Sequence, residues 1–118
     1  MQWNNSQPIY LQVRDHVVSL IIDGVLTSGD PIPSVRQMAV EGGVNPLTVS
    51  KAYQDLVDLK IVEKRRGLGM FITEQAQHYL IKLEKDKFLK GDWPAIVRKA
   101  AQLDIDIAKL IEEGINNG

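Results

Sequence analysis

The sequence predicts an α+β, mostly helical protein, with an N-terminal winged helix-turn-helix followed by a short all-helical C-terminal dimerisation segment. Three observations predict this fold. Two helix-start signals follow each other closely, a short hairpin pattern with a basic tip comes next, and the rest of the chain has helical apolar spacing. A chain of 118 residues without cysteine is long enough to fold around its own core without disulfides. We expect two parts, residues 1–73 and 74–118.

The first helix is expected from about Pro8 to Asp23. Ser6 or Gln7 is expected to cap its start, and proline is well tolerated in the first turn. Apolar residues recur three and four positions apart, which predicts one buried stripe: Tyr10, Val13, Val17, Leu20 and Ile21. Gly24 then supplies a stop signal.

Two further helices form the helix-turn-helix pattern. Ser34 and Gln37 have the spacing of a capping box, which opens a short helix to about Glu41. Asn45 followed by Pro46 repeats the start signal, and the second helix should run to about Leu59. Its core face is predicted to be Val49, Ala52, Tyr53 and Leu56. Two helices joined by a short glycine-containing turn indicate a helix-turn-helix.

A basic hairpin is expected directly after these helices. Residues 61–64 and 70–73 are short runs with strand character, and they are separated by Arg65–Gly69. Residues 60–70 carry four basic side chains and one acidic one, so this stretch has a charge of +3 although the whole chain has −1. Positive charge gathered at one place can bind a polyanion there, even on an acidic body.

The C-terminal part is expected to consist of helices that bury apolar surface against a second copy of the chain. One helix should span residues 75–90, a new one should start at Asp92 or Trp93 before Pro94, and the last should run from Asp106 to about Ile115. The apolar surface is too large for helices that lie loose in water, so dimerisation is the simplest solution. The predicted interface residues are Tyr79, Leu80, Leu83, Phe88, Trp93, Ile107, Leu110 and Ile111.

The exposed face of the second helix has the residue types that read DNA. Leu47, Lys51 and Gln54 lie opposite its core face, and Thr48 and Ser50 flank them. Lysine and threonine suit phosphate oxygens, serine and glutamine can bond to base edges, and leucine can contact a thymine methyl. This face therefore predicts a recognition helix that enters the major groove by its N-terminal half.

Several motifs, in order along the chain, resemble the DNA-binding domain of GntR-family bacterial transcription regulators. They are Pro8–Val13, Gly24–Leu26, Pro33–Arg36, Val44–Val49 and Arg65–Phe71, so the resemblance covers about residues 7 to 73. The short helical C-terminus is similar to that of the YtrA-type subfamily. In that subfamily, this segment serves mainly for dimerisation.

The resemblance implies further site residues. It places Arg36, the stretch 45–47 and Ser50 near DNA, and it puts Gly67 at the tip of the wing in the minor groove. Arg65 and Arg66 fit this picture, because a narrow minor groove attracts arginine. The predicted DNA-binding residues are Ser34, Arg36, Asn45, Pro46, Leu47, Thr48, Ser50, Lys51, Gln54, Arg65, Arg66 and Gly67.

These features predict a sequence-specific DNA-binding regulator, a repressor that binds a palindromic operator as a homodimer. The alternative is a winged helix that contacts other proteins and not DNA, which the near-neutral net charge favours. An enzyme is not expected: there is no cysteine, His16 and His78 are far apart, and no carboxylate pair converges with them. The same features predict no metal site and no cofactor.

Two expectations concern the setting in which the protein works. The N-terminus is polar and unlike a signal peptide, and no apolar run is long enough to span a bilayer, so the protein is expected in the cytoplasm. Whether a small-molecule effector exists is left open. Its expected place is around Tyr79, Phe88 and Trp93.

Overall fold

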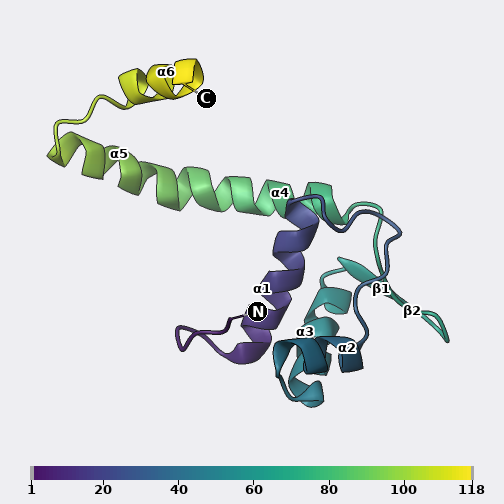
Figure 1. Ribbon diagram of the computed structural model, residues 1–118. Coiled ribbons are helices and arrows are strands. Elements are labelled where there is room, and N and C mark those ends of the chain that lie inside the picture. Colours follow the sequence, from purple (N-terminus) through teal and green to yellow (C-terminus); the bar gives the residue numbers. More distant parts are fainter. Residues whose placement is uncertain (1, 118) are drawn as a thin grey trace. The chain divides into compact units, whose positions relative to one another are not determined.

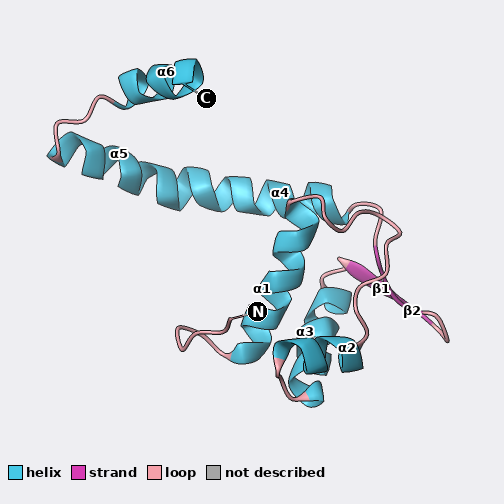
Figure 2. Cartoon of the chain, viewed as in Figure 1, coloured by secondary structure: helices cyan, strands magenta, loops and turns pink. Residues whose placement is uncertain are grey.

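The structure is a computed structural model that describes residues 2–117, with side chains up to residue 114. Helices dominate it (Figure 2). In chain order the elements are α1 (Ile9–Ile22), α2 (Val35–Gly42), α3 (Pro46–Asp58), β1 (Val62–Arg65), β2 (Gly69–Ile72), α4 (Ala76–Lys87), the π-helical turn η1 (Phe88–Asp92), α5 (Trp93–Gln102) and α6 (Ile107–Asn117). The chain forms two compact units, Met1–Ile81 and Lys82–Gly118.

The start of α1 is fixed in a way that the sequence did not predict. Pro8 is the N-cap residue and makes no side-chain hydrogen bond, so the expected capping by Ser6 or Gln7 is wrong. The buried amide of Gln12 holds the preceding residues instead. Its Oε1 accepts from the Asn4 N–H at 2.9 Å, and its Nε2 donates to the carbonyls of Asn4 and Gln7 at 2.7 and 2.8 Å. One helix side chain therefore holds the entry to α1.

The helix-turn-helix is confirmed, together with both predicted start signals. The Ser34 Oγ accepts from the Gln37 N–H at 3.1 Å, and the Gln37 Oε1 accepts from the Ser34 N–H at 2.9 Å, so the capping box is complete. Gly43 ends α2 with φ +62°, a left-handed conformation that glycine adopts without strain. The Asn45 side chain then caps α3, with Pro46 at the first helical position.

The predicted hairpin forms with each strand shifted by one residue from the expected range. β1 and β2 pair antiparallel, with Val62 opposite Ile72 and Arg65 opposite Gly69. The loop before α2 adds a third strand-like segment: the Ile32 N–H donates to the Met70 carbonyl at 3.0 Å, and the Ile72 N–H donates to the Asp30 carbonyl at 2.8 Å. The hairpin tip projects away from the helices of the same unit (Figure 1).

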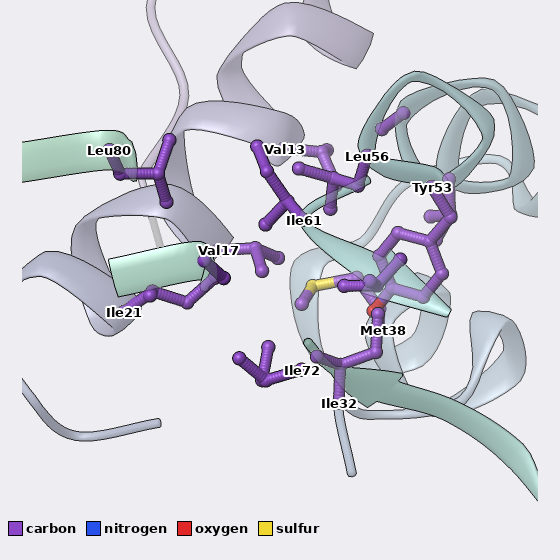
Figure 3. Close-up of a cluster of buried hydrophobic side chains, with 14 of the residues drawn as sticks. Val13, Val17, Ile21, Ile32, Met38, Tyr53, Leu56, Ile61, Ile72 and Leu80 are labelled. Atoms are coloured by element: carbon purple, nitrogen blue, oxygen red, sulfur yellow. The ribbon is translucent and has the colours of Figure 1, made fainter. Parts of the chain in front are cut away.

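The core of the first unit lies where these elements meet (Figure 3). α1 supplies Val13, Val17 and Ile21, which are fully buried and come from the predicted apolar stripe. The other labelled core residues are Ile32, Met38, Tyr53, Leu56, Ile61, Ile72 and Leu80. Burial of a side chain of this size is worth about 1.5–3 kcal/mol, so this cluster is the main source of stability of the unit.

The first unit extends beyond residue 73, the expected boundary, to Ile81. The reason is that Ala76 and Leu80, on the first turns of α4, are buried in its core. Leu80 is 4% exposed. Its assignment to a dimer interface is therefore wrong, since too little of it is left for a second copy to contact.

The second unit contains the remainder of α4 and the elements that follow it. α5 starts at Trp93, as expected, but no break precedes it. Asp92 has helical dihedral angles and no capping hydrogen bond, and the chain passes through η1 into α5 without leaving the helical conformation. α6 starts as expected after Asp106, whose carboxylate accepts from the Lys109 N–H at 3.1 Å. Across residues 2–117, none of the helices combines the length and apolarity that crossing a bilayer requires.

Candidate nucleic-acid interface

The two faces of α3 separate as the sequence predicts. Val49, Ala52, Tyr53 and Leu56 are buried in the core. On the opposite face Leu47 is 79% exposed, Ser50, Lys51 and Gln54 are exposed, and Thr48 is half-buried. The first two turns of α3 therefore present a free surface of one apolar and several polar side chains.

Two of the predicted DNA-binding residues also build the helix starts. The Asn45 Oδ1 accepts from the Leu47 N–H at 2.8 Å, and Ser34 closes the capping box of α2. Each side chain uses one acceptor in this way, and the serine hydroxyl keeps its proton for a further partner. Arg36, two residues after Ser34, is exposed, and none of the ion pairs found in residues 2–117 involves it.

Other polar residues of α3 already have partners within the first unit. The Lys51 Nζ lies 3.9 Å from the centre of the Tyr10 ring, a cation–π contact with α1. The Gln54 Nε2 donates to the Asp58 carboxylate at 2.9 Å, and Arg14 lies 3.9 Å from the Asp55 carboxylate. Lys51 and Gln54 must therefore give up or share a contact when they bind another molecule.

The hairpin and the start of α2 enclose a groove of about 500 Å³. Its walls include Gln37 of α2 and the preceding N-cap residue Ser34, and they include Lys64, Leu68 and Met70 of the hairpin. Lys64 is basic, so the groove has positive charge on one side and helix N-terminal groups on the other. An anionic chain that followed this groove would meet both.

Tyr53 connects the core to this groove. Its hydroxyl donates to the Pro33 carbonyl at 2.8 Å, directly before the Ser34 cap, and it forms part of the groove wall. Burial and, to a smaller extent, the negative charge of Glu41 together raise the pKa of Tyr53 to about 12. The phenol is therefore neutral at physiological pH and keeps its donor role.

Trp3 is a residue of this region that the sequence reasoning missed. Its indole Nε1 donates to the Gly42 carbonyl at 2.8 Å, at the turn between α2 and α3, and its ring packs edge-on against His16 at 6.3 Å. A tryptophan in an otherwise polar N-terminus, followed by Gln12 on an apolar helix stripe, is the signal that could have found it. Together these two residues tie the N-terminal arm to the helix-turn-helix.

The predicted dimer residues fall in both units. Tyr79 is exposed and belongs to the first unit. In the second unit Phe88 and Trp93 face each other with ring centres 6.3 Å apart. Leu83, Leu110 and Ile111 are exposed, and Ile107 is half-buried.

Comparison with known proteins places this geometry in a family. The model of the bacterial regulatory proteins of the gntR family matches residues 9–72, more than half of the chain. The chain is 36% identical to the uncharacterized HTH-type transcriptional regulator YhcF of Bacillus subtilis, over 94% of this chain and 90% of that protein. It is 35% identical to the HTH-type transcriptional repressor YtrA of the same species, over 92% of this chain and 82% of that protein.

Solved structures agree with these sequence matches. A GntR family transcriptional regulator from Listeria monocytogenes superposes with a TM-score of 0.70 at 27% identity, covering 97% of this chain and 98% of that one. The DNA-binding domain of AraR in complex with operator ORR3 gives a TM-score of 0.56 at 27% identity, covering 62% of this chain and 88% of that one. The predicted fold class, a winged helix-turn-helix followed by helices, is thus confirmed, and the relatives are transcriptional regulators and not enzymes.

Proposed function

The chain belongs to the GntR family of bacterial regulatory proteins, and on this premise we propose that it is a repressor that binds a palindromic DNA operator as a homodimer. In each subunit α3 enters a major groove, and the wing, residues 62–72, reaches into the adjacent minor groove. Two subunits related by a two-fold axis require half-sites with the same symmetry, which is why the operator is palindromic. Such a protein works in the cytoplasm, where bacterial DNA lies.

The observation that carries this proposal is the division of α3 into a buried core face and a free polar face. A helix can enter the major groove only if one face holds it in the domain and the other is available to base edges. Leu47, Thr48, Ser50, Lys51 and Gln54 supply that second face. Arg36 and Arg66, exposed at the start of α2 and in the wing, add positive charge for the phosphate backbone.

The acidic residues of α3 support docking by its first half. Asp55 and Asp58 lie in the second half of the helix, where they repel phosphates if the whole helix lies along the groove. Asp55 is close to Arg14 and Asp58 accepts from Gln54, so part of their charge is compensated within the first unit. The N-terminal half of α3, residues 46–51, carries no acid. We therefore assign base reading to this half.

The second unit supports the homodimer. α5 and α6 form an open, mostly apolar groove of about 420 Å³, lined by Ile96, Lys99, Ala100, Ile105, Ile107, Leu110 and Ile111. Leu110 and Ile111 are 54% and 53% exposed in the single chain. A second copy that covers this groove would remove these side chains from water, and a self-complementary contact of this kind gives a closed two-fold dimer.

The proposal is tested by letting the purified chain select duplexes from a random DNA pool. Affinity for a selected duplex is then measured by fluorescence anisotropy at increasing salt. We expect a palindromic consensus, and we expect affinity to fall by about a thousandfold between about 50 and 200 mM salt if about six phosphates are contacted. Arg36→Glu and Arg66→Glu should each weaken binding by at least about tenfold. Lys82→Glu makes the same charge change in the second unit and should leave affinity unchanged.

The result also separates the proposal from its alternative. A winged helix that contacts only proteins would select no consensus, and its weak DNA binding would respond equally to Arg36→Glu and Lys82→Glu. A palindromic consensus lost with Arg36→Glu and kept with Lys82→Glu supports the repressor. Binding of the selected duplex with no dependence on salt would contradict it.

A further inference from the structure

The two arginines of the wing have different surroundings. The Arg65 Nε and Nη2 both donate to the Glu63 Oε1, at 2.9 and 2.8 Å. The Arg65 guanidinium carbon also lies 4.3 Å from the centre of the Phe71 ring, in a cation–π contact. Arg65 is therefore held by an acid and an aromatic ring at the same time.

The register of the hairpin explains this arrangement. Glu63 is directly opposite Phe71, and Arg65 is directly opposite Gly69. Side chains alternate between the two faces of a strand, so Glu63, Arg65 and Phe71 share one face, while the buried Val62 and Ile72 lie on the other. Because Gly69 has no side chain and the space at its Cα is open, Arg65 can lean back along the hairpin to its diagonal neighbour Phe71.

Arg66 occupies a different position. It is the first residue after β1, inside the turn that closes when the Leu68 N–H donates to the Arg65 carbonyl at 2.9 Å. Gly67, with φ +76°, completes this turn in a conformation that favours glycine. Arg66 is exposed, and no ion pair detected within residues 2–117 includes it. Its charge is available at the tip, whereas Glu63 offsets the charge of Arg65.

A brace of this kind has a physical use in this hairpin. Two strands of four residues are marginally stable by themselves, and two glycines with positive φ lie at the tip. A side chain that links both strands on the outer face restricts the motion of the tip. The wing then loses less conformational freedom when it binds DNA. Arg65 can thus raise the affinity without contacting DNA itself.

We propose that Arg65 is a positioning residue that braces the wing through Glu63 and Phe71, and that Arg66 is the wing arginine that contacts DNA. This inference rests on the proposed DNA binding. It assigns separate roles to two adjacent residues that the sequence pattern predicts to act alike.

The test compares Arg65→Gln with Arg66→Gln, which remove the same charge from neighbouring positions. Affinity for a selected duplex is measured by anisotropy over a salt series, in the full-length chain. Arg66→Gln should reduce the slope of log affinity against log salt by about 2, as expected for one lost ionic contact in each subunit of the proposed dimer. Arg65→Gln should weaken binding about threefold to tenfold and leave the slope unchanged.

Phe71→Leu is the matched variant for the brace, because it removes the ring face without changing any charge. It should reproduce the effect of Arg65→Gln, and the double variant should bind no more weakly than either single one, since both act through the same contact. Glu63→Gln provides a second route to the same cluster if Phe71→Leu does not fold. Circular dichroism checks the folding of each variant.

Three results would overturn the inference. They are a slope reduced by about 2 in Arg65→Gln, an affinity unchanged in Arg65→Gln, and a slope unchanged in Arg66→Gln. Failure of the unaltered chain to bind any selected duplex would instead overturn the proposed function, so the two failures are distinguishable. Purely additive losses from Arg65→Gln and Phe71→Leu would also contradict a shared brace.

Discussion

Tyr53 links the hydrophobic core to the start of α2, which we propose faces DNA. The side chain comes from α3, is 1% exposed, and donates its hydroxyl proton to the carbonyl of Pro33. The next residue, Ser34, caps α2, and Arg36 follows in the first turn. One hydrogen bond thus ties the proposed recognition helix to the segment that precedes a predicted phosphate-binding residue on another helix.

Tyr53→Phe should lower the free energy of unfolding by about 1 kcal/mol at pH 7, because the Pro33 carbonyl loses its donor. The pH dependence has a defined sign. Tyr53 ionises near pH 10 in the unfolded chain and at about 12 in the folded one, so the folded state binds more protons between these values and stability falls as pH rises through them. By pH 11 this group should have removed about 1.4 kcal/mol from the unaltered chain.

Urea unfolding of the unaltered chain and of Tyr53→Phe between pH 9 and pH 11 measures this effect. The variant lacks the titrating group, so the difference in stability between the two proteins should shrink as pH rises. The other tyrosines are present in both proteins and cancel in the comparison. An equal fall with pH in both proteins would show that Tyr53 does not have the raised pKa.

At the scale of elements, Asn45 combines a structural role with a position in the predicted DNA interface. Its side-chain oxygen caps α3, and it precedes the residues assigned to base reading. Asparagine and aspartate cap equally well, while alanine does not cap. Aspartate also places a negative charge where DNA phosphates are expected. The two substitutions therefore separate the cap from the contact.

Asn45→Ala should cost about 1 kcal/mol of stability, whereas Asn45→Asp should stay within about 0.5 kcal/mol of the unaltered chain. DNA affinity should show a different order: Asn45→Asp should bind clearly more weakly than Asn45→Ala, because like charges repel at the interface. Thermal unfolding and anisotropy on the same preparations give both values. If Asn45→Asp binds DNA as tightly as the unaltered chain, Asn45 lies outside the interface.

Local signals in the sequence were enough to predict most elements of the first unit. The Ser34 capping box, the Asn45–Pro46 start and the glycines that follow α1 and α2 act within a few residues, so these signals are visible in the sequence itself. The core face of α3 followed in the same way from its apolar spacing. The candidate recognition face was predicted because it is what remains after that core face is assigned.

Interactions between distant residues could not be predicted in this way. Trp3 donates a hydrogen bond to the carbonyl of Gly42 because the fold brings the two together. For the same reason Arg65 pairs with Glu63 and lies over the ring of Phe71. The same reason explains Leu80, whose helical spacing is equally consistent with a core and with an interface. Sequence periodicity identifies an apolar face, but it does not identify what covers that face.

At η1 the local signals give the start of α5 at Trp93 but not the continuity of the helix before it. Gly91 and Pro94 predicted a break, since proline cannot donate a backbone hydrogen bond and usually ends the helix before it. The Trp93 N–H instead donates to the Phe88 carbonyl five residues earlier, which inserts an extra residue into the turn. Pro94 then falls in the first turn of α5, where its missing N–H costs little.

At the scale of the whole molecule, the balance between the two units is informative. The core of the first unit consists of buried residues from α1, α2, α3, the hairpin, the first turns of α4 and the adjoining loops. In the second unit only Ala100 is buried among the described side chains, and apolar residues such as Ile96 and Leu103 are left exposed. An exposed apolar surface of this kind is typical of a site of contact with another protein. The second copy is the partner that we propose for it.

Ile111→Glu tests this proposal, because it places a charge in the middle of the groove between α5 and α6. Sedimentation should give about twice the chain mass of 13.2 kDa for the unaltered chain and about one chain mass for the variant. The midpoint of thermal unfolding should rise with protein concentration for the dimer and should not do so for the variant. Binding to a palindromic duplex should weaken, since a monomer engages one half-site at a time.

Lys109→Gln is the matched control for this experiment. It lies on the same helix and changes the net charge by the same amount, but it replaces a residue outside the lining of the groove. It should leave the dimer mass and the concentration dependence unchanged. A variant Ile111→Glu that keeps the dimer mass would exclude the groove as the contact between subunits. An unaltered chain with the mass of one subunit at all concentrations would remove the two-fold axis, and the palindromic operator would lose its physical basis.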